Sequence, residues 1–198
     1  MFIKICGITN YKDAIDSISC GADALGFVFY DKSPRYIIPT EVRAIIAQLP
    51  PFVKSFGLFV NHSPQEINDI TKISGIDIAQ LHFSCDDRFK NSLKVKYIEV
   101  IRAKSPVDIE IDKDKFYIVD SFVDEYGGQG KRLKLKWFEN QDNSKIILAG
   151  GLTADNLYQL KNYSFCGVDV SSGVEQIIGR KDPQKLKHFC DNARAISR

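Results

Sequence analysis

Lys4-Ile5-Cys6-Gly7-Ile8-Thr9 is the stretch of the chain that decides the fold. It completes an apolar run that starts at Phe2 and is typical of a buried strand. A cysteine closes this run, a glycine follows, and a helical pattern begins soon afterwards. In α/β proteins the reactive groups gather at the carboxyl ends of parallel strands. The stretch therefore predicts an α/β fold with Cys6 at the edge that carries the chemistry.

Further apolar runs repeat this arrangement along the chain. They are rich in Ile, Val and Phe and carry few charges, which indicates strands that are buried on both faces. Eight runs are expected to be strands: Phe2–Cys6, Ala24–Phe29, Val53–Val60, Ile78–Phe83, Tyr97–Arg102, Phe116–Ser121, Lys145–Gly150 and Gly167–Ser171.

Amphipathic segments with helix start signals lie between these runs. Ser63-Pro64-Gln65-Glu66 has the pattern of a capping box with proline at the first helical position. Asp182-Pro183 opens the last helical pattern in a similar way, and Thr153 precedes another directly after a glycine pair. The segment 103–115 holds Pro106 and alternating charges and is too short for a clear helix.

Eight strands, each followed by a helix or its remnant, predict one (β/α)8 barrel domain over residues 1–198. A loop in place of the fifth helix explains why the chain is shorter than the roughly 250 residues typical of such barrels. An open, doubly wound sheet is the alternative architecture.

Composition excludes several classes of function. Lys and Arg number 27 against 25 Asp and Glu, so no strong field attracts nucleic acid. No apolar run approaches the roughly 18–20 residues of a membrane span, and Lys4 interrupts the run that a signal peptide would need. The five cysteines include no Cys-x-x-Cys pair, which favours reduced thiols in the cytoplasm. No cluster has metal-ligand spacing, so no metal is expected.

Chemically capable side chains follow several of the predicted strands. Asp120 ends an apolar strand, and burial would raise its pKa toward that of a general acid near neutrality. Cys6 could be the matching base, although the residues alone fit a core position equally well. Lys4 is on the same strand face and could either assist the thiolate or pair with Asp169 on the eighth strand. His82 could be an acid-base group, but a hydrogen-bonded histidine at a strand end is favoured, and we expect His82 and Asp169 to contact the substrate.

The last two strand ends resemble a phosphate cradle. Gly150-Gly151 allows backbone N–H groups to approach an anion, and a helix start follows. Ser171-Ser172-Gly173 can add hydroxyl and N–H groups from the neighbouring loop. Phosphate sites commonly form after strands seven and eight of such barrels. We therefore expect the phosphate at Gly150, Gly151, Ser171, Ser172 and Gly173.

Two loop segments complete the set of candidates. Arg35 follows Ser33-Pro34 in the loop after the second strand, and its guanidinium could pair with a carboxylate. Gly127-Gly128-Gln129-Gly130-Lys131 lacks a Walker pattern, because Glu125 and Arg132 occupy positions where that pattern needs Gly and Ser or Thr. This segment is expected to be a lid after the sixth strand.

In the order of the chain, these motifs resemble those of the phosphoribosylanthranilate isomerase family. The matching pieces cover almost the whole chain: Lys4–Thr9, Gly21–Phe27, Ser33-Pro34-Arg35, Gly57–Asn61, Gln80-Leu81-His82, Asp120-Ser121, Gly127–Gly130, Leu148–Leu152, Asp169–Glu175 and Gly179–Asp182. Phe83 and Gln129 depart from the family pattern, which usually has a glycine and a small residue there. They affect the expected pocket wall and lid contacts but neither the acid nor the base.

The resemblance implies a reaction and roles for three residues. The reaction is the Amadori rearrangement of N-(5-phosphoribosyl)anthranilate in tryptophan synthesis. Cys6 would be the general base, Asp120 the general acid, and Arg35 the residue that binds the anthranilate carboxylate. Proton transfer alone relieves the charges that form, so no cofactor is expected. The implied partner is a small phosphorylated substrate, and the chain could be a monomer or a homodimer.

Two alternatives to this function remain open. Another phosphate-binding barrel enzyme of histidine or tryptophan synthesis would share the cradle. Such a histidine-pathway isomerase is expected to carry aspartate where Cys6 stands, and indole-glycerol-phosphate synthase relies on lysine and glutamate at strand ends. A non-catalytic barrel that binds phosphorylated sugars is the other alternative, although the presence of both an acid and a base argues against it.

Overall fold

The computed structural model describes residues 1–121 and 134–196, and within these ranges eight parallel strands form a closed barrel. The strands are β1 (Phe2–Cys6), β2 (Ala24–Val28), β3 (Lys54–Phe59), β4 (Ile78–Leu81), β5 (Lys96–Ala103), β6 (Tyr117–Ser121), β7 (Ile146–Leu148) and β8 (Gly167–Val170). Each strand pairs with its neighbour in sequence, and β8 pairs with β1 to close the ring. The predicted barrel is confirmed, and the open sheet is excluded.

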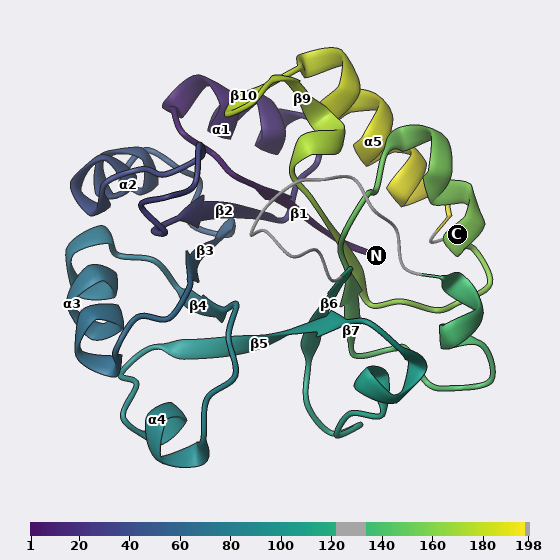
Figure 1. The fold of residues 1–198 in the computed structure, drawn as a ribbon. Coiled ribbons are helices and arrows are strands. Elements are labelled where there is room, and N and C mark those ends of the chain that lie inside the picture. Colours follow the sequence, from purple (N-terminus) through teal and green to yellow (C-terminus); the bar gives the residue numbers. More distant parts are fainter. Residues whose placement is uncertain (122–133, 197–198) are drawn as a thin grey trace.

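Helices surround the ring of strands (Figure 1). The α-helices are α1 (Tyr11–Ser19), α2 (Pro39–Ile46), α3 (Pro64–Ser74), α4 (Asp87–Asn91) and α5 (Pro183–Ala195). The predicted capping box is present at α3, where the Ser63 hydroxyl accepts from the Glu66 amide and the Glu66 carboxylate accepts from the Ser63 amide. Asp182 caps α5 as expected. No helix in the described ranges is long and apolar enough to cross a bilayer.

The outer layer is thin between β5 and β8. Four 3-10 helices occur in the described part of the chain: η1 (Pro106–Ile109), η2 (Leu135–Phe138), η3 (Ala154–Leu160) and η4 (Ser172–Val174). The four-residue η1 confirms that a regular fifth helix is missing. After Thr153 the structure has the 3-10 helix η3 where the sequence suggested an ordinary helix. The segment is short, and the Asn156 side chain binds the backbone at its start.

A small antiparallel hairpin follows β8 and was not predicted from the sequence. It consists of β9 (Glu175–Ile177) and β10 (Arg180–Lys181), and Gly179 adopts a φ of 78° in its turn. The hairpin lies beside α1 in Figure 1. The Thr9 hydroxyl donates to the Gly179 carbonyl at 2.6 Å, which ties the hairpin to the loop after β1.

Side chains on the strands alternate between two apolar clusters. Those facing outward, such as Ile3 and Ile5 on β1, pack beneath the helices. Those facing inward form a smaller cluster that includes Ala24, Phe56 and Ile118. Because the side-chain period is two, polar residues at the inward positions near the strand ends project into the mouth of the barrel.

Candidate active site

Cys6 ends β1 and faces the barrel interior at a buried position. Its strand partner is Gly26, and a Cβ added at Gly26 would lie 2.8 Å from the Cys6 sulfur and 2.9 Å from Lys4 Nζ. The glycine therefore provides the space in which the thiol and the ammonium group lie close together. All five cysteines are free thiols, and Cys6 is the one that lies in this charged environment.

Lys4 and Asp169 form a buried ion pair next to Cys6. Lys4 Nζ lies 2.9 Å from Asp169 Oδ1, and the Lys4 side chain is fully buried. Burial opposes the charge on Lys4, but the Asp169 carboxylate and the Cys6 sulfur outweigh it and raise the pKa of Lys4. The pairing of Lys4 with Asp169 that was considered from the sequence is confirmed, and the Lys4 ammonium group also lies close enough to Cys6 for the two charges to interact.

Burial raises the pKa of the Cys6 thiol above its ordinary value. The positive charges of Lys4 and Lys181 act in the opposite direction, whereas the Asp169 carboxylate adds to the increase. The resting group is therefore a thiol near neutral pH. Its two neighbouring ammonium groups stabilise the thiolate that a base would need.

His82 lies just after β4, beside Gln80. The two side chains approach at 2.9 Å between Gln80 Nε2 and His82 Nε2. Burial, together with the charges of Lys4 and Arg102, lowers the pKa of His82 to about 3. His82 is therefore neutral at physiological pH and can accept or donate a hydrogen bond without carrying charge.

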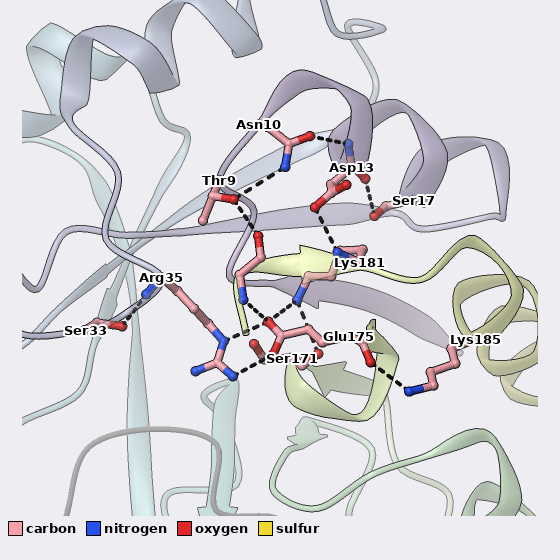
Figure 2. Close-up of polar contacts among 11 residues, drawn as sticks. Thr9, Asn10, Asp13, Ser17, Ser33, Arg35, Ser171, Glu175, Lys181 and Lys185 are labelled. Carbon is pink, nitrogen blue, oxygen red and sulfur yellow. Dashed lines mark hydrogen bonds and ion pairs between the residues drawn. The ribbon is translucent and has the colours of Figure 1, made fainter. Parts of the chain in front are cut away.

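Arg35 is buried and paired within the protein. Its Nε and Nη2 atoms donate to the two carboxylate oxygens of Glu175 at 2.8 and 2.7 Å. Lys181 Nζ donates to the same Glu175 Oε1 at 3.1 Å and to the Ser171 carbonyl at 3.2 Å. Figure 2 shows these contacts, with the third guanidinium nitrogen of Arg35 outside them. Arg35 is thus a built-in part of the barrel mouth and not a solvated surface residue.

Ser171 lies closer to Arg35 than the sequence suggested. A Cβ added at Gly7 would meet Arg35 Cδ at 2.6 Å and Ser171 Oγ at 2.8 Å, so these groups converge over the glycine after Cys6. Gly7 also has a φ of 76°, which only glycine adopts readily. The buried Ser171 hydroxyl has no hydrogen-bond partner in the described part of the protein.

The loops after β7 and β8 are in direct contact, as the predicted cradle requires. A Cβ at Gly173 would overlap the carbonyl oxygen of Leu152. Gly150 and Gly151 have φ values of 86° and 61°, and the Asn156 amide donates to the Gly151 carbonyl at 2.9 Å. Within the described residues, no backbone hydrogen bond uses the N–H of Gly150 or Gly151. Ser172 begins η4, where a helical N–H has no partner within the turn.

Asp120 is partly exposed near the end of β6, three strands from β1 around the ring. Its inward register, two residues after the buried Ile118, places it with the other candidates at the mouth. The predicted lid, Gly127–Gly130, lies outside the described residues. Among those that are described, no three His, Cys, Asp or Glu side chains are arranged to hold a metal ion.

Sequence reasoning missed Glu175 and Lys181 as site residues. Both are charged yet buried, and both belong to the hairpin that was not predicted. One signal was available in the sequence. The stretches Asp169–Glu175 and Gly179–Asp182, which resemble the family pattern, contain these two residues. A charge pattern alone does not reveal burial, so their importance emerges only from the folded chain.

Known proteins resemble this chain over nearly its whole length. The family model described as N-(5′-phosphoribosyl)anthranilate (PRA) isomerase matches residues 3–192. The N-(5′-phosphoribosyl)anthranilate isomerase of Sulfurovum sp. (strain NBC37-1) is 50% identical over 196 residues, covering 99% of this chain and 100% of that protein.

Solved structures of the same family superpose on the barrel. The phosphoribosyl anthranilate isomerase of Thermotoga maritima gives a TM-score of 0.91 at 35% identity, covering 98% of this chain and 99% of that one. A crystal structure of such an isomerase with reduced 1-(o-carboxyphenylamino)-1-deoxyribulose 5-phosphate gives a TM-score of 0.84 at 34% identity, with the same coverage.

Proposed function

The chain belongs to the N-(5′-phosphoribosyl)anthranilate isomerase family, and we propose that Cys6 and Asp120 perform its reaction as general base and general acid. It is an isomerase of tryptophan biosynthesis. The reaction converts N-(5′-phosphoribosyl)anthranilate to 1-(2-carboxyphenylamino)-1-deoxyribulose 5-phosphate. The observation that carries the assignment is the Cys6 thiol, held at the barrel mouth beside the Lys4–Asp169 pair.

The proposed chemistry consists of two proton transfers and one tautomerisation. Asp120 gives its proton to the ribose ring oxygen, and the C1–O bond breaks to leave an iminium ion. The Cys6 thiolate then removes the proton from C2, which forms an enolamine. The enolamine tautomerises to the 2-ketone, and proton exchange restores both side chains. Positioned acids and bases each contribute on the order of 10²–10⁴-fold to the rate of such steps.

The charges around Cys6 support its role as the base. Proton removal converts a neutral thiol into an anion in a buried site, which is costly without nearby cations. The ammonium groups of Lys4 and Lys181 supply these cations and favour the thiolate. Asp169 opposes them while holding Lys4 in place.

The remaining residues are proposed to bind the substrate. The Nη1 group of Arg35 binds the anthranilate carboxylate, because Nε and Nη2 already donate to Glu175. Neutral His82 and the Asp169 carboxylate contact the ribose chain, which the enzyme opens between Cys6 and Asp120. The phosphate occupies the loops at Gly150, Gly151, Ser171, Ser172 and Gly173, where the two glycine segments touch.

We also propose a cytoplasmic location, which the five free thiols support. The chain is a monomer or a homodimer, and sedimentation at two protein concentrations would distinguish these states. The proposed ligand is a small phosphorylated molecule.

A turnover assay on N-(5′-phosphoribosyl)anthranilate tests the function directly. The wild type should form the ketone product, Cys6→Ser should form very little, and Cys20→Ser should retain activity as the matched thiol control. Cys20 caps the end of α1, outside the barrel mouth. Binding of the substrate without turnover by the wild type would instead favour a non-catalytic phosphosugar-binding barrel.

A further inference from the structure

Glu175 occupies an unusual position for a buried carboxylate. Its Oε1 accepts from Arg35 Nε at 2.8 Å, from Lys181 Nζ at 3.1 Å and from the Gly179 amide at 3.3 Å. Its Oε2 accepts from Arg35 Nη2 at 2.7 Å. Four donor atoms from three residues therefore converge on one side chain, and two of these residues, Arg35 and Lys181, are cations (Figure 2).

Glu175 is the counter-ion that makes this arrangement stable. Arg35 and Lys181 are both buried, and Lys181 has no exposed side-chain surface. Burial of a cation without a partner is strongly unfavourable, so the two positive charges depend on the carboxylate between them. Hydrogen bonds from Arg35 and the charge of Lys181 overcome the effect of burial and lower the pKa of Glu175.

The same carboxylate connects three loops of the barrel mouth. Arg35 comes from the loop after β2, and Glu175 and Lys181 face each other in the hairpin after β8. Gly179 in the hairpin turn accepts from Thr9 in the loop after β1. These loops follow β1, β2 and β8 at the mouth of the barrel.

We propose that Glu175 is a positioning residue that sets the enzyme's preference for a substrate with a carboxylate on the aromatic ring. Its carboxylate accepts hydrogen bonds from Nε and Nη2 on one edge of the Arg35 guanidinium, so that Nη1 is held in a single orientation for the ligand. This proposal rests on the proposed function, because it assumes that Arg35 binds that carboxylate.

A guanidinium held in one orientation binds a carboxylate more tightly than a guanidinium that is free to rotate. A two-bond fork removes rotational freedom from Arg35 before the ligand arrives, so less entropy is lost on binding. The proton transfers take place at C1 and C2 of the ribose, away from this contact. Loss of Glu175 should therefore weaken recognition of the carboxylate and change the chemical steps little.

The experiment compares two substrates and four single variants. The substrates are N-(5′-phosphoribosyl)anthranilate and the corresponding aniline derivative, which lacks the ring carboxylate. Glu175→Gln should raise KM for the anthranilate substrate by about ten-fold or more and change kcat by less than about three-fold. For the aniline derivative, kcat/KM should match that of the wild type. Glu175→Asp, which retains the charge, should recover part of the loss.

Asp23→Asn serves as the matched control at the other end of the barrel. Asp23 also accepts from an arginine, Arg194 Nη2, at 2.7 Å and from the Ile3 amide at 2.8 Å. This variant should lower the melting temperature and leave both KM values unchanged. If Glu175→Gln does not fold, Glu175→Asp replaces it in the assay and should show a smaller rise in KM for the anthranilate substrate, with kcat/KM for the aniline derivative unchanged.

The outcomes separate this proposal from the proposed function. The positioning role would be overturned if Glu175→Gln lowered kcat/KM equally for both substrates, or if it lowered kcat alone. Either result would leave the proposed function of the enzyme standing. Arg35→Ala should abolish the preference for the carboxylated substrate, and Glu175→Gln should then add no further loss. If Arg35→Ala keeps the wild-type preference, the assignment of Arg35 is wrong and the positioning role falls with it.

Discussion

At the scale of single residues, the barrel mouth holds charges that would be costly anywhere else in the interior. Lys4, Asp169, Arg35, Glu175 and Lys181 are all buried, and Cys6 lies near both Lys4–Asp169 and Lys181. The cost of burial is offset by close geometry, with ion-pair distances of 2.7–3.1 Å. The result is a prearranged electrostatic field around one thiol.

The first prediction concerns the proposed acid and base. Cys6→Ala and Asp120→Asn should each lower kcat by about 10²–10⁴-fold, because each removes one positioned proton carrier. Substrate affinity, measured by binding to the inactive variants, should change far less. Near-normal turnover in both variants would assign the proton transfers to other groups, with His82 or Asp169 as the next candidates.

The second prediction concerns Lys4 and pH. Because the pKa of Cys6 is raised, the fraction of thiolate is small at neutral pH and kcat/KM should rise with pH through this range. Lys4→Met removes a cation that favours the thiolate, so the rising limb of the profile should move to higher pH.

Two further variants control for charge and stability in this measurement. Lys12→Met removes an exposed lysine and should leave the limb in place. Lys4→Met/Asp169→Asn removes both members of the ion pair, so it avoids an unpaired buried carboxylate and should give a smaller shift. A limb that does not move in Lys4→Met would mean that Lys4 has only a structural role.

At the scale of elements, the short connections after β7 and β8 set the shape of the proposed phosphate site. Gly150 and Gly151 both have positive φ, and Gly173 packs against the Leu152 carbonyl with no room for a side chain. The Asn156 side chain holds the Gly151 carbonyl and the Thr153 amide at the start of η3. The backbone, and not a long helix dipole, therefore forms this site.

The third prediction tests this site with a matched pair of variants. Gly151→Asp should raise KM by about ten-fold or more, because like charges about 4 Å apart repel by roughly 1–4 kcal/mol near a protein surface. In Gly151→Asn the new side chain has the same shape as aspartate, tolerates positive φ and carries no charge, so this variant should raise KM less than Gly151→Asp. An equal rise in KM in the two variants would attribute the effect to the backbone. An unchanged KM in both would mean that the phosphate binds at another place.

At the scale of the whole molecule, closure of the barrel brings these groups together from opposite ends of the chain. Lys4 and Asp169 pair directly because β8 returns to β1. Arg194 of α5 likewise donates to the Met1 and Gly21 carbonyls and to Asp23, which fastens the last helix over the first strand. Stability and site geometry therefore depend on the same closure.

The fourth prediction links His82 to the stability of the fold. Its pKa is about 3 in the folded protein, against about 6.5 in an unfolded chain, so the unfolded state binds more protons between these values. The free energy of unfolding is unaffected above about pH 6.5 and should fall as the pH decreases below it, by at most about 1.4 kcal/mol per pH unit.

Urea unfolding at pH 7 and pH 5 measures this effect. His82→Asn should lose less stability than the wild type between the two pH values, whereas His188→Asn should lose as much as the wild type. His188 belongs to α5, outside the barrel, and serves as the matched control. The same pH dependence in the wild type and in His82→Asn would show that His82 is not the responsible group.

Sequence patterns alone predict the strand order and the missing fifth helix, and they name most of the candidate residues. Strands buried on both faces leave a clear apolar signal, and the local caps at Ser63 and Asp182 act within a few residues. The folded chain is needed to see that Lys4 pairs with Asp169 next to Cys6, and that Arg35 is held by Glu175. These contacts join residues 140 and 165 positions apart. Their charges become buried only when the ring closes, so the sequence could suggest the Lys4–Asp169 pair without deciding it and gave no sign of the Arg35–Glu175 pair.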